Sequence, residues 1–223
     1  MAFTIEELTR RVKKTKHGFI DIRNTADEVV ADETVEESIR LARRLYASEI
    51  HQARVLATFI LGRLAANSDK SLSCLRMRVS KDKDWRVQET LAKAFDRYCA
   101  DVGYKQALPM IREWLADSNP NVRRAVTEGL RIWTNRPYFS DHPQTAVRFL
   151  SHLKDDESEY VRRSAGNALR DISRKHSKIV KTELQKWDIS RKSIRQTYQL
   201  ASRFLRSPRN PMCAHKHNEV MRS

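Results

Sequence analysis

Glycine, proline and cysteine are scarce in this sequence, and each shortage excludes a class of protein. Its 223 residues include 5 Gly and 6 Pro, too few for an all-β protein with its many tight turns. Cys74, Cys99 and Cys213 are odd in number and widely spaced, so no disulfide framework is expected. Val, Ile, Leu and Ala recur instead at helical spacing. The composition therefore predicts an all-α protein.

Long hydrophobic runs are also missing. No apolar stretch approaches the roughly 20 residues that span a bilayer, and the N-terminus lacks the apolar core of a signal peptide. We therefore expect a cytoplasmic protein without a membrane partner. Glycine-rich phosphate loops, nucleophile elbows and HExxH motifs do not occur, and the segment 213–217 resembles a metal tract in composition only. We expect neither a metal nor another cofactor.

Positive charge, in contrast, is abundant and unevenly placed. Lys and Arg number 43 against 28 Asp and Glu, which gives a formal net charge of +15. The acidic residues concentrate between positions 27 and 37, and from Arg123 onward the chain is strongly basic. This asymmetry favours a polyanionic partner, because each phosphate that is neutralised releases condensed counterions. A solvated basic surface without a specific partner is the alternative.

One nine-residue sequence motif, the repeated phrase, occurs twice in similar form. Val-Arg-Arg-Ala-Val-Thr-Glu-Gly-Leu at 122–130 returns 39 residues later as Val-Arg-Arg-Ser-Ala-Gly-Asn-Ala-Leu at 161–169. Spacings of 33 to 39 residues separate these and three fainter copies, which fits two helices plus two short loops. The five anchor positions are Ala53, Val87, Val122, Val161 and Ile194. We predict one α-solenoid domain over residues 1–206 and a disordered tail at 207–223; an unrelated helical bundle is the alternative.

Apolar periodicity and capping residues set the expected helix boundaries. Residues 17–30 are less regular, and the segment 134–143, with two prolines, is expected to be a loop too rich in aromatic and polar residues for a mere connector. The expected helices are 4–16, 36–47, 51–66, 71–80, 85–100, 107–116, 122–133, 144–154, 160–175, 179–187 and 190–205.

The two copies of the phrase resemble a known family. The similarity is to the HEAT-like-repeat DNA alkylation repair proteins, which include the AlkC and AlkD DNA glycosylases, and it covers segments 122–139 and 160–176. Its most specific part is the Asn-x-x-x-Asp-Ile-Ser run that follows the second Val-Arg-Arg. The resemblance implies stacked helical pairs with a concave basic groove for double-stranded DNA, alkylated or not. It also implies metal-independent hydrolysis of the N-glycosidic bond of N3- or N7-alkylated purines. We expect the protein to be a monomer.

The resemblance assigns roles to individual positions. In the family, carboxylates stabilise the cationic transition state and tryptophans shield the lesion by cation–π contact. The catalytic candidates are Glu128 and Asp171, with Asp84 or Glu89 as a third. The lesion-facing aromatic candidates are Trp133, Trp187 and Trp85. The candidates for phosphate contact are Arg123, Arg124, Arg162, Arg163 and Arg195.

A structural role competes with each of these functional roles. One arginine of each pair would brace a neighbouring repeat while the other faces phosphate. Either carboxylate would pair with nearby arginines on its own helix, and Trp133 would be a packing anchor. Trp114, on an apolar helix face, is expected in the core.

This sequence departs from the AlkD pattern of a tryptophan followed four residues later by an aspartate, because the residue four positions after Trp85 is Glu89. Two further functions therefore stay open beside a glycosylase. One is a non-catalytic binder of DNA structures, and the other is a HEAT-type protein-interaction scaffold.

Overall fold

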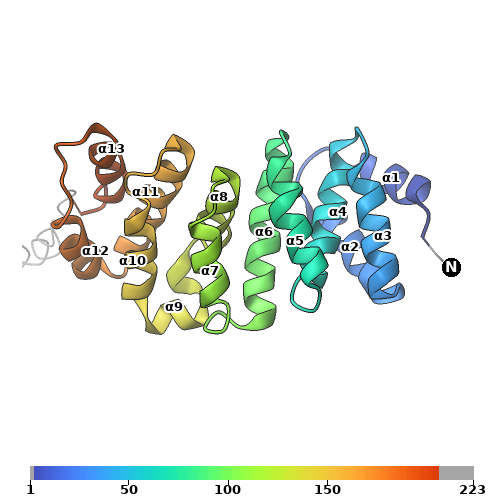
Figure 1. Ribbon diagram of the computed structural model, residues 1–223, viewed down its shortest axis with the longest axis horizontal. Helices are drawn as coiled ribbons and strands as arrows, with labels where there is room; N and C mark the ends of the chain where they lie inside the picture. Colours follow the sequence, from blue (N-terminus) through green and yellow to red (C-terminus); the bar gives the residue numbers. More distant parts are fainter. Residues whose placement is uncertain (1–2, 206–223) are drawn as a thin grey trace, which may run out of the picture.

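The computed structural model describes residues 3–205, which form helices and contain no β-strand. The helices stack in antiparallel pairs along one axis, from α1 at one end to α13 at the other (Figure 1). The predicted all-α class and solenoid architecture are confirmed. The predicted tail at 207–223 lies outside the described residues.

Each pair has a first and a second helix, and both kinds form a row along the stack. The first-helix row consists of α3 (Val35–Tyr46), α5 (Asp69–Met77), α7 (Leu108–Leu115), α10 (Pro143–His152) and α12 (Ser177–Leu184). The second-helix row consists of α4 (His51–Leu64), α6 (Trp85–Val102), α8 (Pro120–Gly129), α11 (Glu159–Ser173) and α13 (Lys192–Ala201). The remaining elements are α1 (Ile5–Lys13), α2 (Ile20–Asp32), α9 (Pro137–Asp141) and the 3₁₀ turns η1 (Val79–Lys81) and η2 (Trp133–Asn135).

The core runs through the second-helix row. All five predicted anchor positions lie in second helices and are at most 3% exposed. Neighbouring second helices pack directly on one another, α4 on α6, α6 on α8, α8 on α11 and α11 on α13. At the α6–α8 contact the backbones nearly touch, since a Cβ added to Gly129 would lie 2.3 Å from the carbonyl oxygen of Ala92. Only glycine permits this approach.

An aspartate precedes three of the second helices and shapes the turn that leads into each. Asp82, Asp117 and Asp156 accept a hydrogen bond from the backbone N–H two residues later, at 2.8 Å in every case. Such an Asx turn sets the chain for helix entry. The residue two positions after the aspartate is then the N-cap of α6, α8 or α11. The repeated acidic lead-in is thus a helix-start device.

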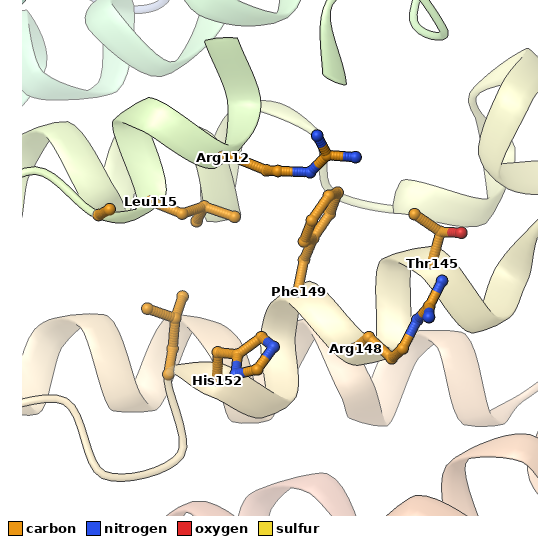
Figure 2. Close-up of a pocket in the computed structure, with 8 residues that line it drawn as sticks. Arg112, Leu115, Thr145, Arg148, Phe149 and His152 are labelled. Carbon is orange, nitrogen blue, oxygen red and sulfur yellow. The ribbon is translucent and has the colours of Figure 1, made fainter. Parts of the chain in front are cut away.

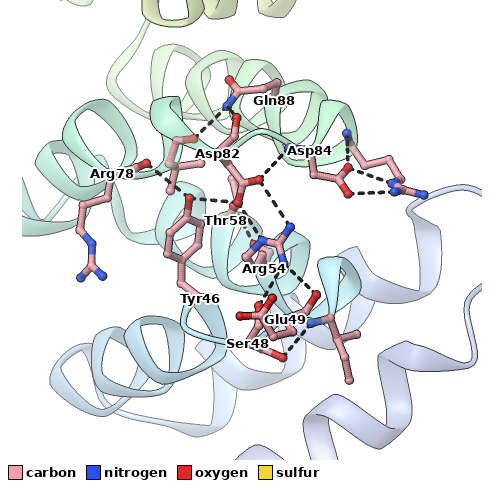
Figure 3. Close-up of polar contacts among 12 residues, drawn as sticks. Tyr46, Ser48, Glu49, Arg54, Thr58, Arg78, Asp82, Asp84 and Gln88 are labelled. Carbon is pink, nitrogen blue, oxygen red and sulfur yellow. Dashed lines mark hydrogen bonds and ion pairs between the residues drawn. The ribbon is translucent and has the colours of Figure 1, made fainter.

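Arg54 shows how these turns are tied together (Figure 3). Its Nη1 donates to the carbonyl oxygens of Ser48 and Glu49, both at 3.0 Å, in the turn before its own helix α4. Its Nε donates to Asp82 Oδ2 of the next repeat at 2.8 Å. One guanidinium therefore closes its own turn and binds the following repeat. In α6 the neutral Gln88 occupies this position and donates to the carbonyl oxygens of Val79 and Asp82.

Arg123 repeats the arrangement of Arg54 two repeats later. Its Nη1 donates to the carbonyl oxygens of Asp117 and Ser118 at 2.7 and 3.0 Å. Its Nε and Nη2 donate to the two carboxylate oxygens of Asp156, each at 2.7 Å. The side chains of Arg123 and Asp156 are 8% and 6% exposed. Both charges are therefore inside the protein, where each is satisfied by the other and by backbone, and Arg123 Nη2 also lies 3.3 Å from Oε1 of the exposed Glu157.

Two segments are more ordered than the sequence suggested. Residues 17–30, expected to be irregular, contain most of α2, whose buried Ile22, Ala26 and Val29 belong to the core and which packs against α4. Segment 134–143, expected to be a loop, contains α9 and most of η2. Phe139 of α9 is fully buried, and its ring lies 5.0 Å from that of Trp133. This insertion explains the longest repeat spacing.

Replacing Arg123 with methionine should destabilise the protein strongly. The aliphatic stem is kept, but Asp156 is left as a buried charge without its partner, which typically costs about 3–5 kcal/mol. Urea unfolding followed by circular dichroism measures this loss. The matched substitution Arg163→Met, at an exposed arginine of α11, should change stability by less than about 0.5 kcal/mol. Equal effects of the two substitutions would contradict the bracing role of Arg123.

Candidate nucleic-acid interface

Glu128 and Asp171, the two carboxylates predicted as catalytic, lie on neighbouring second helices and meet through an arginine. Glu128 belongs to α8 and Asp171 to α11. Arg131 places Nη1 3.5 Å from Glu128 Oε2 and Nε 2.9 Å from Asp171 Oδ2. Ser164 Oγ of α11 also donates to Glu128 Oε1 at 2.7 Å. Side chains from two repeats thus form one cluster where α8 meets α11.

Asp171 is also held from its own helix. Arg170 donates to Asp171 Oδ1 from Nε at 3.0 Å and from Nη2 at 2.9 Å, and only 10% of the Asp171 side chain is exposed. Burial acts to lower the pKa of Arg131, but the hydrogen bond and charge of Asp171 outweigh it, so the net shift is upward. Two guanidiniums therefore face two carboxylates. The cluster has no excess negative charge to stabilise a developing cation.

Asp84 and Glu89, the candidates for a third carboxylate, both lie at the start of α6. Asp84 is the N-cap of α6 and accepts the backbone N–H of Arg86 at 2.9 Å. The Arg86 guanidinium binds both oxygens of Asp84, at 2.9 and 2.8 Å, and this hydrogen bonding lowers the pKa of Asp84 to about 2. Glu89 accepts from Lys93 Nζ at 3.3 Å. Asp84 is therefore a helix cap, whereas Glu89 is a partly exposed surface carboxylate.

The expected lesion-facing positions of Trp133 and Trp187 are corrected by the structure. Trp133 is fully buried and Trp187 is 6% exposed. Trp133 Nε1 donates to the carbonyl oxygen of Thr127 at 3.4 Å, and Trp187 Nε1 donates to Ser151 Oγ at 3.0 Å. Both indoles are packing anchors whose polar atoms are satisfied inside the protein. Trp114 is fully buried, as expected.

Two other aromatic rings are exposed in the second-helix row. Trp85, a predicted aromatic candidate, is 68% exposed at the start of α6. Tyr160, in the first turn of α11, is 73% exposed. The guanidinium of Arg124 lies 5.8 Å from the centroid of the Tyr160 ring, within cation–π range. Tyr160 was not among the predicted aromatic residues, although its place directly before a buried anchor, Val161, indicates an outward-facing ring.

The five arginines predicted to contact phosphate divide into two groups. Arg123 braces the next repeat, and Arg162 Nη1 donates to the carbonyl oxygens of Asp156 and Glu157 at 2.6 and 3.1 Å. The phosphate role expected for these two is therefore corrected to a structural one. Arg124 is partly exposed and lies 4.0 Å from Glu89, whereas Arg163 and Arg195 are exposed. In both Val-Arg-Arg copies the first arginine is structural and the second reaches toward solvent.

Further basic side chains are exposed at the α11–α13 end. The ring of Phe204, 36% exposed, lies 4.2 Å from the guanidinium carbon of Arg174 and 5.6 Å from that of Arg170. Among residues 3–205, Arg174, Arg195 and Arg203 have no carboxylate within ion-pair distance, and Arg163 is 3.8 Å from an exposed Glu159. We call Arg163, Arg174, Arg195 and Arg203 the basic set.

Within the described chain no group of three or more His, Cys, Asp or Glu side chains is arranged to hold a metal ion. The segment 213–217 lies beyond the described residues. No helix between residues 3 and 205 is both long and apolar enough to cross a membrane.

Comparison with known proteins gives one family and three informative relatives. A family model described as DNA alkylation repair enzyme matches residues 18–205. AlkD2 from Streptococcus mutans, a crystal structure, is 47% identical over 91% of this chain and 98% of its own, with a TM-score of 0.88. The crystal structure of smu.31 from Streptococcus mutans UA159 is 46% identical over 90% and 99% of the two chains, with a TM-score of 0.84.

The uncharacterized protein YhaZ of Bacillus subtilis (strain 168) is 31% identical over 87 residues. The match covers 37% of this chain and 24% of YhaZ, so the similarity spans about a quarter of that relative's length.

The capping role of Asp84 has a defined pH signature. Because folding lowers its pKa from near 3.8 to about 2, its contribution is complete above pH 4 and is lost as the pH falls toward 2. Asp84→Ala should cost about 1 kcal/mol at neutral pH, and this deficit should shrink below pH 4. Asp84→Asn keeps a capping oxygen and should lose less at neutral pH. Urea unfolding at stepped pH measures both variants; a deficit for Asp84→Ala that is independent of pH would contradict the charged cap.

Proposed function

Because the chain belongs to the DNA alkylation repair enzyme family, we propose that it binds double-stranded DNA through exposed side chains of its second-helix row and does so without excising a base. The family resemblance of the two Val-Arg-Arg copies is confirmed by this match. The proposal rests on one observation, the basic set, whose guanidiniums are exposed and lack close carboxylate partners except for one weak pair.

Phosphate oxygens are the natural counterions for such guanidiniums. Arg163 and Arg174 lie 11 residues apart on α11 and just past its end, which corresponds to about 16 Å along a helix axis. That distance is enough to reach phosphates on both sides of a groove about 12 Å wide. Arg195, on the neighbouring helix α13, adds a further cation. Tyr160, exposed beside Arg124, supplies a flat ring for contact with sugar or base.

Base excision is disfavoured by the state of the two carboxylates. A carboxylate that stabilises an oxocarbenium-like transition state needs a field that is not already neutralised. Asp171 accepts hydrogen bonds from two guanidiniums, and Glu128 from Ser164 while Arg131 lies beside it. Two of the three indoles that were to shield a cationic base, those of Trp133 and Trp187, lie in the core, and only Trp85 is exposed. A binder of intact or damaged DNA therefore fits the geometry best.

A metal-independent alkylpurine glycosylase is the second candidate function, and one observation favours it. Glu128 and Asp171 converge from two repeats on a single residue, Arg131, whose side chain is 34% exposed. If a DNA phosphate drew Arg131 away, both carboxylates would lose one cation at the same time. The cluster would then carry the excess negative charge that its free form lacks.

We expect the protein to act in the cytoplasm, because its family is one of DNA alkylation repair. We also expect it to act as a monomer, because every residue invoked in DNA contact comes from one chain. No second copy is needed to complete the surface.

The binding proposal predicts a steep dependence on salt. If three phosphates are neutralised, affinity for a duplex of about 25 base pairs should fall roughly 40-fold between 50 and 200 mM salt. The triple variant Arg163→Gln, Arg174→Gln, Arg195→Gln should reduce the slope of log affinity against log salt by about 2.7. Fluorescence anisotropy measures both quantities.

A control variant with the same change in net charge is Arg43→Gln, Arg44→Gln, Lys105→Gln, at exposed positions of α3 and the α6–α7 turn. It should keep the wild-type slope. An affinity that does not respond to salt, or equal losses in the two triple variants, would remove the basis for this DNA surface.

A release assay separates binding from excision. Incubated with methylated duplex DNA, the wild-type protein should release no 3-methyladenine or 7-methylguanine beyond the rate of DNA alone. Release by the wild type that disappears in Glu128→Gln and in Asp171→Asn would establish the glycosylase instead. Circular dichroism checks that both variants remain folded, so that loss of release is not loss of structure.

A further inference from the structure

A pocket of about 430 Å³ opens between α7 and α10, in the first-helix row. Arg112 and Leu115 of α7 form one wall, and Arg148, Phe149 and His152 of α10 form the other (Figure 2). The pocket lies at the repeat boundary where η2 and α9 are inserted, between the two helix pairs that they separate. None of its residues belongs to the basic set. It is therefore a separate site from the proposed DNA surface.

The ionisable residues that line the pocket are all basic. Arg112, Arg148 and His152 are exposed, and no carboxylate is among the lining residues. None of the three has a hydrogen-bond or ion-pair partner for its side chain within residues 3–205. The nearest carboxylates of α7 and the turn after it, Glu113 and Asp117, are both bound by Arg76 of α5. The charge of the pocket is thus left for an anion from solution.

Phe149 gives the pocket a flat apolar surface. It is half-buried, and its ring centroid lies 6.2 Å from that of the buried Trp133, which supports it from behind. The guanidinium carbon of Arg112 lies 5.9 Å from the same ring. Figure 2 shows Arg112 at the outer edge of the Phe149 ring, with Arg148 beside Thr145 on the other side. A planar group could stack against Phe149 while its anionic substituent reaches either arginine.

We propose that this pocket binds a small planar aromatic anion of the nucleoside monophosphate class. The base packs on Phe149 and Leu115, and the phosphate is bound by Arg112 and Arg148. The volume falls within the range of about 300–1,000 Å³ that is usual for small-molecule sites. Guanidiniums bind phosphate in a bidentate manner, and the charge of about −1.5 to −2 on a phosphate monoester at pH 7 favours it over a monoanion when two arginines are present.

Titration of the full chain with adenosine 5′-monophosphate tests the proposal. Heteronuclear NMR should show saturable one-to-one binding with shifts confined to α7, α10 and η2, and a Kd below about 1 mM. Adenosine alone and inorganic phosphate alone should each bind at least roughly tenfold more weakly, because each lacks one of the two contacts.

Two sets of variants separate the contribution of the two arginines from that of the Phe149 ring. Arg112→Gln with Arg148→Gln should weaken adenosine 5′-monophosphate at least roughly tenfold, whereas the control pair Arg43→Gln with Arg44→Gln should leave its affinity unchanged. Phe149→Leu, which keeps an apolar side chain at this half-buried position, should abolish the preference for adenosine 5′-monophosphate over inorganic phosphate.

Three results on affinity would overturn the proposal. They are no saturable binding at about 10 mM nucleotide, adenosine binding as tightly as its monophosphate, and equal weakening by the control pair. Shifts confined to α11 and α13 would also overturn it, since they would assign the nucleotide to the DNA surface; that outcome leaves the proposed function intact and so distinguishes the two proposals.

Discussion

The solenoid depends on the buried pairing of a turn aspartate with an arginine of the preceding repeat. Asp82, Asp117 and Asp156 each shape the entry of their own second helix and each bind a guanidinium from earlier in the chain, that of Arg54, Arg76 or Arg123. The same carboxylate therefore fixes where a helix begins and how its repeat sits on the one before. Apolar packing alone would allow neighbouring pairs to slide, because it is not directional. The ion pairs give the stack its register.

This structural use of arginine decides which cations are left for a partner. The first arginine of each Val-Arg-Arg copy donates to backbone carbonyl oxygens, so much of its hydrogen-bonding capacity is used within the protein. The second arginine, one residue on and about 100° around the helix, faces outward. A net charge of +15 therefore overstates the field available to a polyanion. The exposed positive charge that lacks carboxylate partners is concentrated around α11 and α13, and separately between α7 and α10.

The sequence predicts those features that recur with the repeat, but not those that depend on tertiary packing. The five anchors predicted the second helices because a residue buried once per repeat must recur at the repeat spacing. Helix α2 was missed because polar Asp21, Asn24 and Asp27 interrupt its apolar positions, which find their partner only in the distant α4. Glu128 and Asp171 were expected either to be catalytic or to pair with arginines of their own helices, and Asp171 does pair with Arg170 of α11. Their common partner Arg131 lies just past the end of α8, so the direction of its side chain depends on the path of the chain there and not on helical spacing. The burial of Trp133 likewise depends on Phe139, a residue of an insertion that no repeat predicts.

The position of the aspartate turns has a mechanical consequence. All second helices run in the same direction, so the turns before them lie along one edge of the stack, and the connection through α9 lies along the other (Figure 1). Because the ion pairs at these turns hold neighbouring repeats together along the first edge, we expect the stack to bend mainly by separating helix ends along the other edge. We expect such bending to change the boundary between α7 and α10, where η2 and α9 are inserted between the two first helices. The curvature of the second-helix row and the width of the pocket between α7 and α10 would then change together.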